Sequence, residues 1–566
     1  MRLFILQRSR HFTRFAALWI ALWGTVSAFA DNSKISPDLL PLLQNSSASV
    51  NVIVQYNSPP QTCSGGGFLG ALLCTVVNVV GGIVKGLLTI VDGVAATITA
   101  GDIVNLSNQS NVQYISLDRP LTATLDYAAA AVNAPYAWSN GLDGTGVGIA
   151  VIDSGIYSHP DLRSRVVYRQ SFIGGAQFDD YGHGTHVAGI LAGSGSASSQ
   201  AGSFRNLKGI APNANLLDLR VLDQNGMSTD SAVISALQQA VALKSKYNIR
   251  VINLSIGRPI YEGCKQDPLC KAVEAVWKNG IVVVVAAGNL GRNGYATVTS
   301  PGNSPHAITV GAMKTMETAP RSDDLIASYS SKGPTYIDLT VKPDVVAPGN
   351  TVVSLLAPGS TLVAEYPGNV IAPSYYTTST SAPGGQYFQL SGTSMATPVV
   401  SGAVALLLQK EPGLSPDTVK ARLMKTAYKA FPLASTATDP TTGAVYLDTY
   451  DIFTVGAGYI DIAAALNDYE TIYGSAISPS VSYNSQLLTA VLLNPNGSCW
   501  NNGAWSPTNV WGTQVIQPLG GTSAAWGSSA AWGSSAAWGS SAAWGSSAAW
   551  GSSAAWGSSV GGKGEQ

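Results

Sequence analysis

Short runs of continuously apolar residues alternate with amphipathic stretches between residues 123 and 468. The amphipathic stretches Asp230–Lys246 and Cys270–Asn279 are long enough to form helices. The apolar runs have the length and the valine and isoleucine content of strands buried on both faces; they are Val147–Ile152, Asn215–Leu222, Arg250–Leu254 and Gly280–Val285. Strands and helices in alternation predict an α/β fold, with a parallel β-sheet flanked by helices on both faces.

Polar residues follow three of these runs at their carboxyl ends. They are Asp153, Ser255 and Asn289. Ligands of open parallel sheets bind outside the carboxyl ends of the strands. We therefore expect these three side chains to lie near a functional site.

The first thirty residues have the pattern of a secretory signal peptide. An apolar core, Phe15–Val26, is followed by the small residues Ala28 and Ala30 at the positions that a signal peptidase requires. The apolar core is preceded by four positive charges, Arg2, Arg8, Arg10 and Arg14. The alternative is a permanent membrane anchor, for which the core is too short. We expect a secreted or extracytoplasmic protein.

Residues 31–122 combine strand-like and apolar segments. Val50–Tyr56 alternates apolar and polar positions, and Val112–Ser116 has the composition of a second strand. The apolar segment Phe68–Val91 is interrupted by Lys85, so it is marginal for a membrane span and is better explained by a packed helix or hairpin. These features predict a small α+β domain.

The amino-acid composition of the C-terminal part of the chain changes twice. Residues 469–520 are rich in Asn, Pro and Ser and predict a linker or extension with loop-like structure. Residues 521–566 contain the repeat Ala-Ala-Trp-Gly-Ser-Ser, a low-complexity extension without a charge from Gly521 to Gly562. One interpretation is a flexible tail. The other is an attachment module for a cell surface or polysaccharide, because aligned aromatic faces bind sugars.

Charge and cysteine content limit the possible partners and chemistry. Only 11% of residues are charged and the net charge is −1, which argues against a nucleic-acid or anionic-membrane partner. Export permits disulfides, and the spacing favours Cys264 with Cys270, then Cys63 with Cys74. This pairing leaves Cys499 over, and no Cys-x-x-Cys spacing suggests a zinc or redox site.

The stretch Tyr181–Gly189, "YGHGTHVAG", holds His183 and His186 three residues apart. This spacing places two side chains on one face of a helix, so metal binding is geometrically possible. A zinc site needs a third ligand, however, and the spacing His-Glu-x-x-His is absent. The alternatives are a catalytic base and an ordinary packing residue.

Two further residues are ambiguous alone and informative together. Asp153 in "VIDSG" has the pattern of a turn residue, and Ser394 in "GTSMATP" that of a helix cap. Asp153, His183 and Ser394 each lie within two residues of a glycine, at a strand end or helix start. A carboxylate, an imidazole and a hydroxyl are the three groups of nucleophilic serine catalysis.

The segments "VIDSGI", "HGTHVAG" and "GTSMATP" resemble the three motifs of the subtilases, the subtilisin-like serine peptidases. The resemblance covers residues 123–468. It implies a subtilisin-like fold with Ser394 as nucleophile, His183 as general base and Asp153 as the residue that orients the imidazole. His186 then becomes a packing residue.

The resemblance also implies an oxyanion hole and a substrate site. Asn289 in "AAGN", with Ser394, would stabilise the oxyanion. Two backbone segments would hold an extended peptide, and Leu290 stands where several subtilases have a glutamate, so we expect large apolar side chains at the cleaved residue. The expected substrate-binding residues are Gly226, Met227, Ser228, Leu254, Ser255, Ile256, Gly257, Ala287, Gly288 and Leu290.

By the same resemblance, residues 31–122 are a propeptide that assists folding, inhibits the enzyme and is removed by self-cleavage near Thr122–Leu125. We expect a monomer acting on protein or peptide substrates, with no cofactor in the chemistry. Structural calcium stays open, because Asp161 resembles one ligand while the second ligand loop is not recognisable in residues 193–206. The rival functions are a passive surface-attachment scaffold and a metal-dependent hydrolase.

Overall fold

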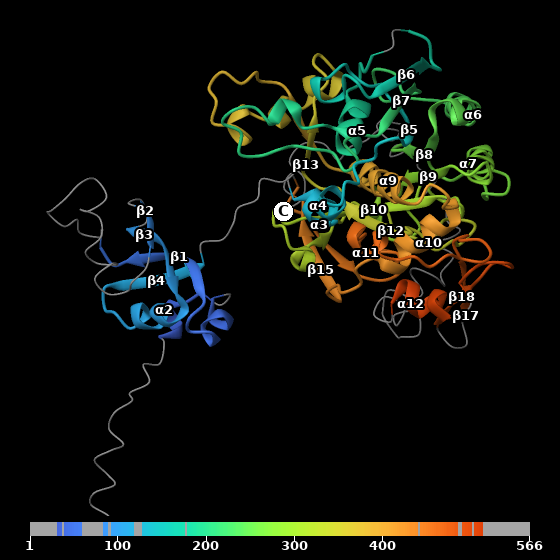
Figure 1. Ribbon diagram of the computed structural model, residues 1–566. Coiled ribbons are helices and arrows are strands. Elements are labelled where there is room, and N and C mark those ends of the chain that lie inside the picture. The colour runs from blue at the N-terminus through green and yellow to red at the C-terminus, as the bar shows by residue number, and fades with distance from the viewer. Residues whose placement is uncertain are drawn as a thin grey trace, which may run out of the picture. The chain divides into compact units, whose positions relative to one another are not determined.

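The computed structural model divides into two compact units, Met1–Thr122 and Ala123–Gln566 (Figure 1). It describes residues 31–36, 39–58, 83–88, 92–117, 127–175, 178–439, 442–484, 489–500 and 503–512. The predicted signal peptide, Cys63, Cys74, the cleavage region Thr122–Leu125 and the repeat at 521–566 lie outside these residues. Each unit is described by itself.

In its described residues, the first unit contains an antiparallel sheet and the helix α2. The strand order is β2-β3-β1-β4, and α2 follows β3 directly in the chain. The elements are β1 Ser49–Tyr56, β2 Ile83–Leu88, β3 Gly93–Thr99, α2 Ala100–Ser107 and β4 Val112–Leu117. Both predicted strands are confirmed as β1 and β4. The end of the apolar segment 68–91 forms a strand, β2, which pairs with β3 as one arm of a hairpin.

The second unit contains the predicted mainly parallel sheet. Its order is β11-β10-β9-β8-β5-β7-β6, with β12 beside β10, and the described pairs are parallel except β10 with β11. The strands are β5 Gly148–Asp153, β6 Val166–Ser171, β7 Asn215–Arg220, β8 Ile249–Leu254, β9 Val282–Ala286, β10 Ile308–Lys314, β11 Leu325–Ile326 and β12 Val345–Pro348. All four predicted strands are present, with bounds shifted by one or two residues.

Two pairs of helices cover this sheet (Figure 1). The helices α5 (His183–Ala192) and α9 (Thr393–Lys410) pack against each other, and α9 contacts β8, β9, β10 and β12. On the other face, α6 (Asp230–Tyr247) and α7 (Pro268–Lys278) contact each other and the strands β8 and β9. The α/β prediction is confirmed, and so are both predicted helices.

The other described elements are smaller; η1 and η2 belong to the first unit and the rest to the second. The helices are α3 Ala128–Ala131, α4 Ala134–Ser139, α8 Thr361–Glu365, α10 Pro416–Thr426 and α11 Ile462–Leu466. Two further antiparallel pairs are β13 Val352–Leu355 with β14 Tyr387–Leu390, and β15 Ala434–Thr438 with β16 Val445–Thr449. The 3₁₀ turns are η1 Asn32–Lys34, η2 Leu40–Gln44, η4 Pro160–Leu162, η5 Ser196–Ser198, η6 Gly291–Asn293, η7 Arg321–Asp323, η8 Pro367–Asn369, η9 Pro373–Tyr375 and η10 Gly503–Trp505.

The expected loop-like character of residues 469–520 is wrong for part of the described segment. Three regular elements form there: β17 (Ser480–Asn484), β18 (Thr489–Leu493) and α12 (Pro507–Trp511). Trp500 and Trp511 are fully buried in the core of the second unit and meet edge to face at 5.2 Å between ring centroids. The two buried indoles pack this segment against the core, although its average composition is polar.

Covalent and membrane features complete the fold. The predicted disulfide between Cys264 and Cys270 is present, with 5.3 Å between the Cα atoms. Cys499 is a buried free cysteine. Within the described ranges, no helix has the length and apolar character to cross a membrane.

Candidate active site

Asp153 and His183 meet at the carboxyl edge of the sheet. Asp153 is the last residue of β5, and His183 is the first residue of α5. His183 Nδ1 lies 2.7 Å from Asp153 Oδ1, and both side chains are buried. The same carboxylate oxygen accepts a hydrogen bond of 2.8 Å from the backbone N–H of Ser154, which fixes its orientation. An imidazole held in this way keeps its Nε2 for the cleft.

The surroundings of His183 favour its protonated form. Burial lowers the pKa of the imidazole, but the negative charge and hydrogen bond of Asp153, together with the charge of Asp179, outweigh burial and raise the pKa above its usual value. His183 Nε2 is buried and has no hydrogen-bond partner among the described residues. This nitrogen is therefore placed to accept a proton from a nearby group.

Ser394 lies in the first turn of α9, where backbone N–H groups have no acceptor within the helix. Its Oγ donates to the carbonyl oxygen of Ser255 over 3.1 Å. In return, Ser255 Oγ donates to the carbonyl oxygen of Ser394 over 2.9 Å. These reciprocal bonds join the start of α9 to the end of β8.

Asn289 follows β9 and contacts the residue before Ser394. Its Oδ1 accepts hydrogen bonds from the backbone N–H and the Oγ1 of Thr393, at 2.9 and 3.1 Å. Thr393 Oγ1 also accepts a bond of 3.1 Å from the N–H of Gly288. Because its oxygen is held in this way, the amide of Asn289 has one orientation beside the N-terminus of α9, where the helix dipole also favours negative charge.

The expected substrate segments lie along the same edge. Residues 254–257 continue from β8 and are buried, while Met227 and Ser228 are half-buried in a turn held by Asp223. Gly226 has φ 72° and packs against Tyr181, whose ring would lie 2.8 Å from an added Cβ. A side chain larger than hydrogen is excluded there, so this backbone stays close to the residue two places before His183.

Thr299 lies beside both expected pocket walls, a position that the sequence does not reveal. Its Oγ1 would lie 2.4 Å from a Cβ at Gly257 and 3.0 Å from one at Gly288. Thr299 is therefore located between the two expected walls of the primary side-chain pocket, residues 254–257 and 287–290. Only the two glycines leave room for it.

Asp179, a buried carboxylate next to the candidate triad, is also not evident from the sequence. Asp179 accepts bonds from Ser154 Oγ (2.7 Å), Gly182 N (2.7 Å), Thr185 N (2.8 Å) and Thr185 Oγ1 (2.6 Å). Burial raises the pKa of Asp179, and these bonds offset part of that rise. The signal in the sequence is an acid four residues before His183, at the start of a helix without a capping side chain.

His186 contributes to packing. Its side chain is buried, and its Nε2 lies 3.0 Å from the carbonyl oxygen of Phe388 and 3.2 Å from that of Val352. Burial and the neighbouring His183 lower its pKa to about 3. Across the ranges that the structure describes, no three His, Cys, Asp or Glu side chains are grouped as metal ligands.

Asp161 does not match a calcium ligand set. Its Oδ1 accepts from Ser196 Oγ (2.8 Å) and from the backbone N–H of Ala197 (2.7 Å), and its Oδ2 accepts from Tyr387 OH (3.0 Å). Calcium needs six to eight oxygen atoms as ligands, and the neighbours of this carboxylate are hydrogen-bond donors instead. We derive no step of the chemistry through a metal.

Comparison with known proteins gives consistent results. Residues 144–458 match a profile of the subtilase family. The chain is 41% identical over 328 residues to serine protease AprX of Bacillus subtilis strain 168, covering 56% of this chain and 69% of that protein. It is 34% identical over 366 residues to subtilisin E of the same strain (62% and 80%), and 33% identical over 308 residues to subtilisin DY of Bacillus licheniformis (54% and 92%). The profile match spans every candidate side chain described above.

Proposed function

The chain belongs to the subtilase family and is a serine-type endopeptidase, and from this premise we propose that Asp153, His183 and Ser394 carry out its chemistry. The observation that carries the proposal is the 2.7 Å contact between His183 Nδ1 and Asp153 Oδ1. Ser394 is the second residue of α9, which begins at Thr393. Protein or peptide chains are the substrates.

The first step forms an acyl-enzyme. The hydroxyl of Ser394 turns from the carbonyl of Ser255 toward His183 Nε2, gives up its proton and attacks the carbonyl carbon of the scissile bond. Negative charge then develops on the carbonyl oxygen. The amide of Asn289 and the backbone N–H of Ser394 stabilise that oxygen as hydrogen-bond donors.

The second half of the reaction returns the enzyme to its starting state. His183 donates its proton to the leaving amine, so the peptide bond breaks and the ester on Ser394 remains. A water molecule then attacks the ester carbon while His183 accepts its proton. His183 passes this proton to Ser394 Oγ as the ester bond breaks, which releases the acid product and restores the hydroxyl. Asp153 keeps the imidazole in the required tautomer and stabilises its cationic form in both halves.

Specificity follows from the two walls of the primary pocket. Residues 254–257 and 287–290 contain no carboxylate, and Leu290 ends the second wall. We therefore propose that large apolar side chains are preferred over basic ones at the cleaved residue. The backbone segments at 226–228 and 254–257 hold the substrate chain as an added strand, which binds main chain and tolerates many sequences.

Maturation and export form a second part of the proposal. Residues 31–122 act as an intramolecular inhibitor that the enzyme removes near Thr122–Leu125 after export. The first unit has a hydrophobic core of its own, and this supports the role, since a domain that folds separately stays intact until the chain is cut at its boundary. We further propose that residues 521–566 attach the enzyme to a cell surface or polysaccharide; equal surface retention with and without them would argue for a flexible tail only.

The experiment compares purified wild type with Ser394→Ala for hydrolysis of a denatured protein and for mature termini. Wild type should release peptides and lack residues 31–122, and the variant should do neither. A sulfonyl fluoride should abolish wild-type hydrolysis and a zinc chelator should leave it intact. Hydrolysis lost only to the chelator would support the metal-dependent alternative, and a folded but inactive wild type would support the passive scaffold. A variant already trimmed at the boundary would exclude self-cleavage.

A further inference from the structure

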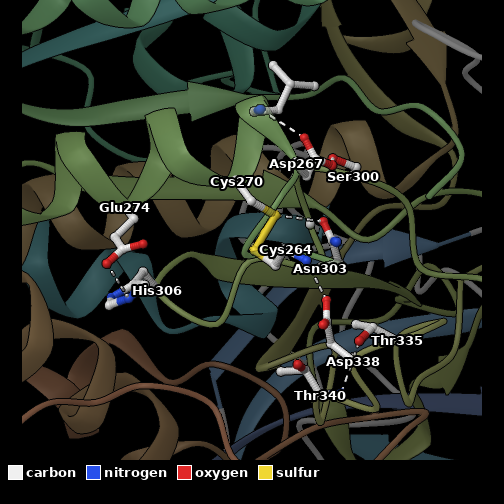
Figure 2. The surroundings of a disulfide bond; sticks show 12 residues. Cys264, Asp267, Cys270, Glu274, Ser300, Asn303, His306, Thr335, Asp338 and Thr340 are labelled. Carbon is white, nitrogen blue, oxygen red and sulfur yellow. Dashed lines mark hydrogen bonds and ion pairs between the residues drawn. A yellow bond between two sulfur atoms is a disulfide. The ribbon is translucent and has the colours of Figure 1, made fainter. Parts of the chain in front are cut away.

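Asp267 is a fully buried carboxylate at the start of α7, inside the loop closed by the Cys264–Cys270 disulfide (Figure 2). Its Oδ1 accepts from the backbone N–H of Leu269 over 2.8 Å and caps the helix. A cap needs one oxygen, yet both oxygens are in use. Asp267 therefore has contacts beyond those of an ordinary helix cap.

The additional contacts are to Arg258 and Ser300. Arg258 Nη2 donates to Asp267 Oδ1 over 2.9 Å, and Ser300 Oγ donates to Asp267 Oδ2 over 2.7 Å. Figure 2 shows Ser300 next to Asp267 on the side away from Glu274 and His306. Both partners are buried, so these are strong charge-assisted bonds in a medium of low polarity.

Arg258 and Ser300 are also joined through their backbones. The N–H of each donates to the carbonyl of the other, both over 2.8 Å, in an isolated antiparallel bridge. Arg258 directly follows the wall segment 254–257, and Ser300 directly follows Thr299, which lies between the two expected walls. The bridge therefore sets the spacing between one wall of the primary pocket and Thr299.

The loop that carries Asp267 is held on both sides. The disulfide closes it between residues 264 and 270, and the N–H of Cys264 donates to Asp338 Oδ2 over 2.6 Å (Figure 2). Arg258 is held independently by Asp230 at the start of α6, at 2.9 Å. One buried carboxylate thus connects a rigid loop to both sides of the Arg258–Ser300 bridge.

We infer that Asp267 is a positioning residue for the primary side-chain pocket, holding Arg258 and Ser300 so that the pocket keeps the width that a large apolar side chain requires. The inference rests on the proposed peptidase function. A large side chain of the substrate fills the pocket and depends on its walls, whereas an alanine does not reach them. Loss of the carboxylate lowers hydrolysis after a large residue and leaves hydrolysis after alanine nearly unchanged.

The test uses two peptide substrates that differ only in phenylalanine or alanine at the cleaved residue. The variants are Asp267→Asn, which cannot accept from both partners, and the milder Ser300→Ala, which removes one bond. The readout is the ratio of kcat/KM for the two peptides, because a smaller folded fraction lowers both values equally. The matched control is Asp461→Asn, since Asp461 caps α11 and pairs with Arg321 away from the pocket.

We expect the ratio to fall by about three- to tenfold in Asp267→Asn and by less in Ser300→Ala, mainly through KM for the phenylalanine peptide, and to stay constant in the control. A ratio equal to that of wild type in both pocket variants overturns the inference while leaving the peptidase function intact. Wild-type protein that cleaves neither peptide and is not labelled at Ser394 overturns the proposed function, and the inference with it.

Discussion

Ser394 and Ser255 exchange hydrogen bonds: each hydroxyl donates to the other residue's carbonyl oxygen, at 3.1 and 2.9 Å. Ser255 Oγ also accepts from Asn253 Nδ2 over 3.0 Å. Ser255→Ala should therefore lower kcat by about tenfold, because the first turn of α9 loses a contact that positions Ser394. It should also lower the free energy of unfolding by about 1–3 kcal/mol, since a buried Asn253 donor loses its acceptor. Steady-state kinetics and chemical denaturation measure the two effects.

Ser401→Ala is the matched control for that prediction. Ser401 donates to the other end of the same side chain, Asn253 Oδ1, over 2.8 Å, two helical turns beyond Ser394. Ser401→Ala should lower the free energy of unfolding by a similar amount and leave kcat unchanged. Equal losses of kcat in the two variants would mean that the effect comes from lowered stability and not from positioning.

The pH dependence should report His183. Its pKa is raised, with burial opposing the larger combined effect of Asp153 and Asp179. The general base must be neutral, so kcat/KM should fall as the pH drops through this pKa, with a midpoint above the ordinary histidine value of about 6.5. The other facing titratable groups are His186, protonated only near pH 3, and Tyr181, whose pKa burial raises.

Asp153→Asn supplies the corresponding variant. Without the carboxylate, the pKa of His183 should fall, and kcat should drop by about 10⁴-fold because the tautomer is no longer held. An NMR titration of the His183 imidazole in a Ser394→Ala background, assigned with His183→Gln, follows the pKa directly. A wild-type midpoint at or below 6.5, or one that Asp153→Asn does not move, would contradict the assigned pairing.

Asn289→Ala should lower kcat and leave KM nearly unchanged. The amide is needed only when charge develops on the oxyanion, and loss of one such donor costs about 10²- to 10³-fold in kcat, a magnitude known for subtilisin. Thr393→Val is a useful comparison. It removes the Oγ1 that contacts Asn289 Oδ1 and Gly288 N, but it keeps the Asn289 amide that donates to the oxyanion. Its effect should be much smaller. If KM rose in proportion to the loss of kcat/KM, Asn289 would act in substrate binding instead.

Thr299 should limit the depth of the primary pocket. Thr299→Gly should raise kcat/KM for a phenylalanine peptide relative to an alanine peptide by about tenfold, because the side chain between Gly257 and Gly288 is removed. Thr299→Val keeps the volume and loses only the 3.3 Å bond from Oγ1 to the carbonyl of Ala287, so its ratio should match wild type. A wild-type ratio in Thr299→Gly together with an altered ratio in Thr299→Val would place Thr299 outside the pocket.

The parts of the molecule that followed from the sequence share one property: their signal is local. Continuous apolar runs gave β5, β7, β8 and β9, and the strand ends then located Asp153, Ser255 and Asn289. The packed part of residues 469–520 is not evident from the sequence, because its burial depends on Trp500 and Trp511 among polar residues. Asp267 was missed because its contact with Ser300 spans 33 residues, which no local periodicity encodes.

The most direct test of the central claim is labelling by a sulfonyl fluoride, followed by intact mass and peptide mapping. Wild type should gain one adduct, on Ser394, in step with complete loss of hydrolysis. His183→Ala should label far more slowly, because its serine lacks a base. Peptidase activity that persists in Ser394→Ala, or an inactivating adduct on a different residue, would contradict the assignment of Ser394 as the nucleophile.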